Sequence, residues 1–187
     1  MARREIRIAG FGGQGVVLSG VLLGQAGLEY GKYAVQNQSY GAEARGGAAR
    51  SEVILDEEPI TYPEVLSPDV MAALSQAALD KYVDDLAKGG SLILDSDLVT
   101  QIPQGLDATV YGGRFADVAA KELGKPIVAN IVMLGFLAEI TGIVSPDAIR
   151  KAVAAGVPKG TEALNLKALE RGIEMGAELR AQGNGQG

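Results

Sequence analysis

The chain has 187 residues, a net charge of −6 and a pI near 4.8, and 47% of its residues are hydrophobic. This length suits one domain with a substantial core. The acidic balance argues against a nucleic-acid partner, because proteins that bind the phosphate backbone normally carry a basic face. The sequence has no cysteine and no histidine. It therefore lacks thiol nucleophiles, iron–sulfur ligands, the commonest metal ligand and the commonest general base, and we expect neither catalytic residues nor a metal site in it.

The opening sequence, MARREIRIAG, enters a predicted strand at once, without the pattern of a secretory leader. The apolar runs are all shorter than a membrane-spanning helix. We therefore expect a cytoplasmic protein with no membrane partner.

Predicted strands alternate with predicted helices in the first half of the chain, and helices dominate the second half. The expected strands cover residues 5–9, 33–38, 50–55, 70–74, 91–95 and 109–111. The expected helices cover residues 15–30, 76–87, 115–123, 128–141, a segment that begins at Ser145 and Pro146, and 162–179. This order predicts an α/β fold, namely a Rossmann-like, doubly wound, mostly parallel sheet with a helical C-terminal layer.

Several positions mark where the predicted elements begin and end. Gly31 is placed to end the first helix, Ser145 suits an N-cap and Pro146 suits the first helical position. We expect residues 1–180 to form a single domain. We expect residues 181–187, AQGNGQG, to be a disordered tail because they have nothing to bury.

The stretch IAGFGGQGVVLSG contains G-x-G-x-x-G at Gly10, Gly12 and Gly15, between a strand and a helix. A dinucleotide-binding fold places its phosphate-binding turn there, but it also needs an acidic residue at the end of the second strand. That strand ends in the amides of residues 36–38, so the fingerprint is only half present and we expect no NAD site. The helix N-terminus could still receive another phosphate or a carboxylate, or the glycines could simply let the helix lie close to the sheet.

A second glycine-rich loop, QSYGAEARGG, follows the strand over residues 33–38 and holds Glu43 and Arg45. Arginine is suited to phosphate or carboxylate, although the alternative is a surface ion pair between these two side chains. We expect this strand to be the neighbour of the strand over residues 5–9, so that both glycine-rich loops emerge at the carboxyl edge of the sheet, where ligands bind in open α/β folds. The candidate site residues are Gly12, Gly13, Gln14, Gly15, Ser39, Tyr40, Gly41, Glu43, Arg45, Gly46 and Gly47.

Three further features are less specific. Asp95 and Asp97 in LDSDLV could be paired carboxylates, but their turn-rich context favours turn chemistry. Asn130 is an amide in the apolar helix over residues 128–141, where it is either a satisfied core amide or a contact to a partner. The same helix is apolar on all sides, so it is either core or part of an obligate interface.

The chain resembles the gamma subunit of 2-oxoacid:ferredoxin oxidoreductases, and most closely the 2-oxoglutarate type. Together, the matching stretches cover nearly the whole chain, and SYGAEARGG is the most diagnostic of them. They are GFGGQGVVLSG, QSYGAEARGGAARSEVI, SPDVMAALSQAALDKY, GGSLILDSDLV, IVANIVMLGFLAEITGIVS and VPKGTEALNLKALERG. The resemblance is specific for the family and less so for the oxoacid.

The resemblance implies a chain that binds no cofactor by itself and is inactive alone. The expected partners are alpha, beta and ferredoxin-like delta subunits, with thiamine diphosphate, Mg²⁺ and iron–sulfur clusters held elsewhere and ferredoxin as the electron acceptor. The resemblance also implies that the candidate residues form an edge facing CoA or a neighbouring subunit. Two alternatives remain open at this point: a nucleotide-binding redox or regulatory module with a Rossmann-like turn, and a scaffold that touches no ligand.

Overall fold

The structure is a computed structural model that describes residues 3–39 and 48–183. Within these residues, six strands form one sheet in the order β2-β3-β1-β4-β5-β6. The strands are β1 (Arg4–Phe11), β2 (Tyr33–Ser39), β3 (Ala48–Asp56), β4 (Val70–Ala73), β5 (Gly90–Asp95) and β6 (Ala108–Gly113). β1, β4, β5 and β6 pair in parallel, whereas β3 is antiparallel to both β1 and β2. In this sheet only β3 runs against the common direction, which confirms the mostly parallel sheet.

The expectation that the first two strands are neighbours is wrong, because β3 lies between β1 and β2. Only residues 40–47 separate β2 from β3, and short connections join antiparallel neighbours. β3 therefore returns beside β2 and fills the position next to β1. Since β2 still points in the direction of β1, the two strands end at the same edge of the sheet. Arg50 of β3 pairs with Ala9 on one side and with Ser39 on the other.

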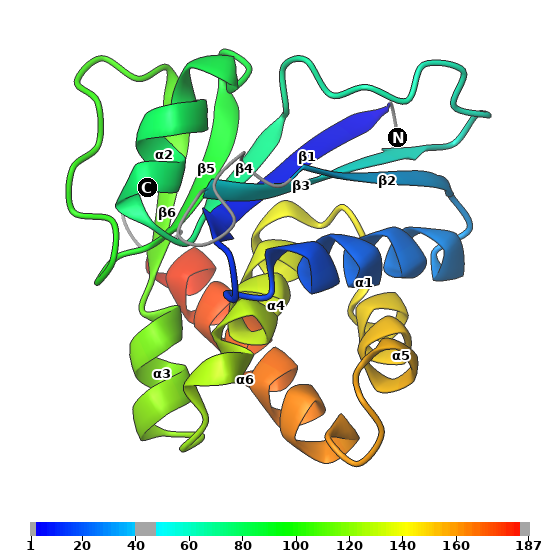
Figure 1. Ribbon diagram of the computed structural model, residues 1–187, viewed down its shortest axis with the longest axis vertical. Coiled ribbons are helices and arrows are strands. Elements are labelled where there is room, and N and C mark those ends of the chain that lie inside the picture. The colour runs from blue at the N-terminus through cyan, green and yellow to red at the C-terminus, as the bar shows by residue number, and fades with distance from the viewer. Residues whose placement is uncertain (1–2, 40–47, 184–187) are drawn as a thin grey trace.

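Helices cover both faces of the sheet, as expected for a doubly wound fold. The helices are α1 (Val16–Glu29), α2 (Gln76–Tyr82), α3 (Phe115–Lys121), α4 (Ala129–Thr141), α5 (Pro146–Gly156) and α6 (Glu162–Gly183), with 3-10 helices η1 (Val83–Asp85) and η2 (Pro126–Val128). Figure 1 shows α1, α4, α5 and α6 gathered on one side of the sheet, where they form the expected helical layer. α2 packs on the opposite face, against a separate and smaller core.

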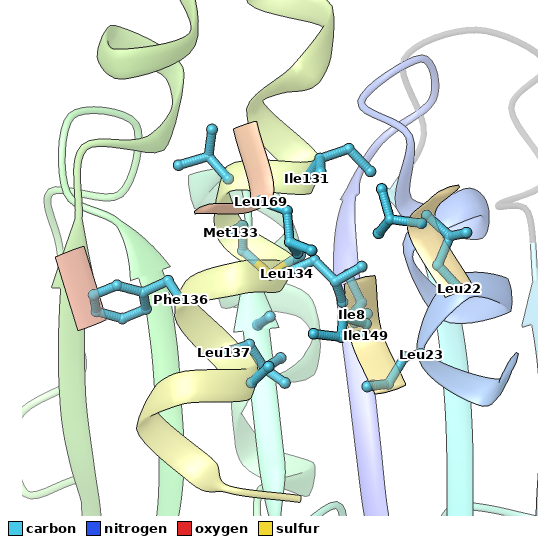
Figure 2. Close-up of a cluster of buried hydrophobic side chains, with 14 of the residues drawn as sticks. Ile8, Leu22, Leu23, Ile131, Met133, Leu134, Phe136, Leu137, Ile149 and Leu169 are labelled. Atoms are coloured by element: carbon cyan, nitrogen blue, oxygen red, sulfur yellow. The ribbon is translucent and has the colours of Figure 1, made fainter. Parts of the chain in front are cut away.

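The core divides according to the alternation of side chains along the strands. Ile6 and Ile8 of β1 join the larger cluster beneath α1 and α4, whereas Ala9 joins the smaller cluster beneath α2. Figure 2 shows how Leu134 and other α4 side chains meet those of β1, α1, α5 and α6 in the larger cluster. Residues 130–138 of α4 are all buried, so the chain itself covers this apolar helix. The core alternative for the helix is confirmed.

The predicted caps are also confirmed. Gly31 follows α1 with a φ of 79°, a left-handed conformation that suits glycine. The Ser145 hydroxyl accepts a hydrogen bond from the Ala148 N–H at 3.2 Å, and Pro146 occupies the first turn of α5. Across residues 3–39 and 48–183, no helix is both long enough and apolar enough to cross a membrane.

The expected boundary of the C-terminal tail is wrong by three residues, because α6 continues through residues 181–183. Ala181 and Gln182 are both good helix formers, so the helix extends beyond its last buried turn. The rest of the expected tail, residues 184–187, lies outside the described residues.

Candidate functional site

The glycine turn between β1 and α1 is held by the side chain of Gln14. Its carboxamide oxygen accepts a hydrogen bond from the Phe11 N–H at 2.6 Å, and its amide nitrogen donates to the Leu74 carbonyl at 3.0 Å. A Cβ on Gly10 would lie 2.6 Å from that same carboxamide oxygen and 3.1 Å from the Leu74 Cβ. Gly10 therefore makes room for the Gln14 amide, which ties the turn to the end of β4.

Gly15 caps α1 in a left-handed conformation, with a φ of 71°. The Asn130 amide donates to the Gly15 carbonyl at 3.2 Å and to the Ser19 hydroxyl at 3.3 Å, and this hydroxyl in turn donates to the Gly15 carbonyl at 3.1 Å. Asn130 is only 3% exposed. It is therefore a satisfied core amide that joins α4 to the first turn of α1, and this alternative for Asn130 is confirmed.

This geometry predicts different costs for alanine at Gly15 and at Gly13. A Cβ on Gly15 would lie 2.4 Å from the Asn130 amide nitrogen, whereas a Cβ on Gly13 would meet no described residue within 4 Å. Both glycines have positive φ values, so each substitution should strain the backbone by about 1–2 kcal/mol. Gly15→Ala should lower the free energy of unfolding by at least about 1 kcal/mol more than Gly13→Ala, because it also displaces Asn130. Urea unfolding of the two variants measures this difference, and equal losses would contradict the tight contact.

A cavity of about 290 Å³ opens at the carboxyl edge, between the ends of β1 and β4. The chain leaves β1 toward one side of the sheet and continues from β4 toward the other, so the cavity lies at the topological switch point where open α/β folds bind ligands. It is lined by Gly13, Gln14, Leu74, Asp95, Leu98, Ala116, Pro126, Ile127, Ala129 and Asn130. We call it the switch-point cavity.

Among the described residues that line this cavity, Asp95 is the charged one, and backbone N–H groups donate to its carboxylate. Its two oxygens accept hydrogen bonds from the Asp97 N–H at 3.0 Å and from the Ala116 N–H at 2.8 Å. Burial raises the pKa of the Asp95 carboxyl, and these backbone donors partly offset that rise. Asp97 points elsewhere and forms an ion pair with Arg114 at 3.0 Å. The prediction of turn chemistry is therefore confirmed for the Asp95 side chain, whereas the Asp97 side chain forms an ion pair instead.

The structure places part of the predicted site at this edge. The turn over residues 12–15 lies beside the switch-point cavity, and Ser39 ends β2 at the same edge, with β3 intervening. Tyr40, Gly41, Glu43, Arg45, Gly46 and Gly47 lie outside the described residues. Leu98 and Ile127 also line the cavity, and the sequence reasoning missed both of them. A Cβ on Gly12 would meet none of the described residues within 4 Å, so no described side chain covers the turn on that side.

The sheet order and the switch-point cavity define a Rossmann-like α/β protein with a cavity at the carboxyl edge of its sheet. The family model described as pyruvate ferredoxin/flavodoxin oxidoreductase matches residues 5–175, and the chain belongs to this family. The resemblance found in the sequence is thereby confirmed.

Three relatives show how this fold unit occurs in other proteins. The 2-oxoglutarate synthase subunit KorC of Methanocaldococcus jannaschii is 52% identical over 95% of this chain and 96% of its own. The crystal structure of a keto/oxoacid ferredoxin oxidoreductase gamma subunit from Geobacter sulfurreducens is 44% identical, with a TM-score of 0.84 over 94% of this chain and 99% of that one. The ketoisovalerate oxidoreductase subunit VorA of Methanothermobacter thermautotrophicus is 36% identical over 93% of this chain but only 36% of VorA.

Proposed function

We propose that this chain is the gamma subunit of a 2-oxoglutarate:ferredoxin oxidoreductase. The overall reaction converts 2-oxoglutarate, CoA and oxidised ferredoxin to succinyl-CoA, CO₂ and reduced ferredoxin. The observation that carries the proposal is the 52% identity to a 2-oxoglutarate synthase subunit over nearly the whole of both chains. The ketoisovalerate relative is less similar, at 36%, which favours 2-oxoglutarate as the substrate of the complex.

In this proposal the chain supplies no redox or acid–base group. It has no cysteine to ligate an iron–sulfur cluster and no histidine to act as a general base. In the switch-point cavity, the side chains of Gln14, Asp95 and Asn130 are all hydrogen-bonded to backbone groups of the chain itself. As the family resemblance implies, the proposal assigns thiamine diphosphate with Mg²⁺ and the clusters to alpha, beta and delta subunits and expects this chain to be inactive alone.

The proposed contribution of this chain is its carboxyl edge, which faces CoA or a neighbouring subunit. The open side of Gly12 supports this role, because another backbone or ligand can approach there without meeting a side chain of the described residues. The N-terminus of α1 follows directly at Val16 and favours negatively charged groups. Ser39 ends β2 at the same edge, whereas Tyr40, Gly41, Glu43, Arg45, Gly46 and Gly47 lie outside the described residues and stay predicted members of the site.

The alternative of a dinucleotide-binding module has weaker support. Two of the three amides near the end of β2 are engaged within the chain, since Gln36 donates to the Ser51 hydroxyl at 2.8 Å and Asn37 donates to the Pro63 carbonyl. None of them supplies the carboxylate that holds a ribose in dinucleotide-binding folds.

Reconstitution tests the proposed function. The chain is co-expressed with the subunits encoded beside it, and succinyl-CoA formation is measured with 2-oxoglutarate, CoA and an electron acceptor. We expect turnover with the full set of subunits and none with this chain alone. Failure to assemble, or a preference for another 2-oxoacid, would contradict the proposal.

Gly12→Ala in the same complex tests the edge. It should leave the free chain as stable as the wild type while raising the KM for CoA or weakening assembly, and unchanged values of both would remove the edge from the proposal.

A further inference from the structure

Two cavities adjoin at η2, on either side of Ile127. The switch-point cavity lies on one side, and a second cavity of about 240 Å³ lies on the other, between the starts of α1 and α6. Ile127 and Asn130 contribute to the lining of both. The Ile127 side chain is 68% exposed although its neighbour Val128 is only 4% exposed. The short 3-10 turn that begins at Pro126 therefore presents an isoleucine outward between two hollows.

The linings of the two cavities beside Ile127 are largely apolar. We define the η2 surface as Ile127, Leu98, Pro126, Leu18, Pro158 and Leu164, all of which line one or both cavities. Among residues 3–39 and 48–183, the lining of the second cavity contains no charged residue, and that of the switch-point cavity contains only the buried Asp95. Charged residues make up 21% of the chain. Depletion of charge around an exposed apolar side chain is typical of the centre of a protein–protein interface.

The length of the ketoisovalerate relative supports one kind of partner for this surface. The region similar to this chain makes up only 36% of VorA, so the same fold unit is there joined covalently to a larger polypeptide. KorC has no such additional region, because this chain matches 96% of its length. KorC therefore has to bind another subunit to make the contacts that VorA can make within one polypeptide. The η2 surface is continuous with the proposed CoA-facing or subunit-facing edge, because Gly13 and Gln14 line the switch-point cavity together with Ile127.

We infer that the η2 surface docks the partner subunit that corresponds to the rest of VorA. Ile127 inserts into that subunit, and apolar side chains of the partner fill the two cavities beside it. This inference rests on the proposed function, since it requires the chain to be a subunit of a larger enzyme. A buried anchor at the centre of an interface commonly dominates affinity, so a charge at this position should weaken binding by at least about 30-fold.

The chain offers a matched control for the test. Leu66 lies in the connection between β3 and β4 and is also 68% exposed, but it lines neither cavity. Ile127→Asp and Leu66→Asp therefore introduce the same charge at equally exposed apolar positions. Chemical unfolding of the free variants first establishes that each is folded. The dissociation constant of each variant for the purified cognate partner subunit is then measured by biolayer interferometry.

We expect Ile127→Asp to raise the dissociation constant at least about 30-fold and Leu66→Asp to change it less than about threefold. Binding of both variants like the wild type would overturn the docking surface and leave the proposed function standing. Equal weakening by both variants would also overturn it, because the effect would not be specific to η2. Failure of the wild-type chain to bind any cognate subunit would instead overturn the proposed function itself.

Discussion

Replacing Arg7 with methionine should lower the free energy of unfolding by about 3–5 kcal/mol, as expected when one partner of a buried ion pair is removed. Arg7 lies in β1, facing α2, and is only 2% exposed. Its Nε donates to the Glu52 carboxylate at 2.8 Å, and its guanidinium also pairs with Asp85. Glu52 is itself only 9% exposed, so Arg7→Met leaves a largely buried carboxylate without its main partner.

The groups that surround Arg7 cannot replace it. Arg50 approaches Glu52 no closer than 3.8 Å, and its guanidinium lies 5.5 Å from the centre of the Tyr82 ring. Arg7 also donates to the Val65 carbonyl at 3.3 Å and thereby holds the connection that precedes β4. Methionine preserves most of the length of the side chain. The decrease in the free energy of unfolding therefore reports the missing charge and hydrogen bonds more than a cavity.

Urea unfolding with two control variants tests this expectation. Arg4→Met removes another arginine of β1, but that arginine is 39% exposed and lies 4.0 Å from Asp69, so its loss should stay below about 1 kcal/mol. The double variant Arg7→Met, Glu52→Met should recover much of the stability that Arg7→Met loses, because it leaves no unpaired buried charge. A loss at Arg7 no greater than the loss at Arg4 would show that the buried pair contributes little.

Much of the fold could be predicted because its signals are local. Gly31 and Ser145 mark helix ends through backbone conformation and capping, which depend only on neighbouring residues. The place of β3 beside β1 could not be predicted in the same way, since hydrophobic pattern identifies a strand but not its partners. One signal was available: the run of amides over residues 36–38 suits an edge strand, and β2 is at the edge.

The candidate site, too, could be predicted where its signals are local and could not be predicted where it depends on residues far apart in the sequence. The glycine spacing located the turn at the carboxyl edge, but the bond between Gly15 and Asn130 joins residues 115 positions apart and leaves no trace in a local pattern. Ile127 stands beside the apolar run of α4, so its sequence context suggests burial. Its exposure depends on the 3-10 turn at Pro126, which only the three-dimensional structure shows.

The second large effect is expected in the helical layer, where α4 and α6 approach each other through glycine. A Cβ on Gly172 would lie 1.9 Å from the Val132 carbonyl oxygen, and a Cβ on Gly135 would lie 2.2 Å from the Leu169 carbonyl oxygen. Both clashes are with backbone, which cannot change rotamer to make room. Gly172→Ala should therefore force the helices apart and lower the free energy of unfolding by about 3 kcal/mol, although alanine favours helix.

The matched control for Gly172→Ala is the same substitution at Gly24 in the interior of α1. A Cβ on Gly24 would lie 3.7 Å from the Gln36 Cβ, which is an ordinary contact, so Gly24→Ala should raise the free energy of unfolding by about 0.5–1 kcal/mol.

The double variant Gly135→Ala, Gly172→Ala adds a sharper criterion, because both methyl groups push the same two helices apart. Once one of them has moved the helices apart, the second should cost less, so the combined loss should be smaller than the sum of the two single losses. If the decreases in the free energy of unfolding are additive in thermal or urea unfolding, each substitution disturbs only its own neighbours. The two helices would then not be held by one shared contact.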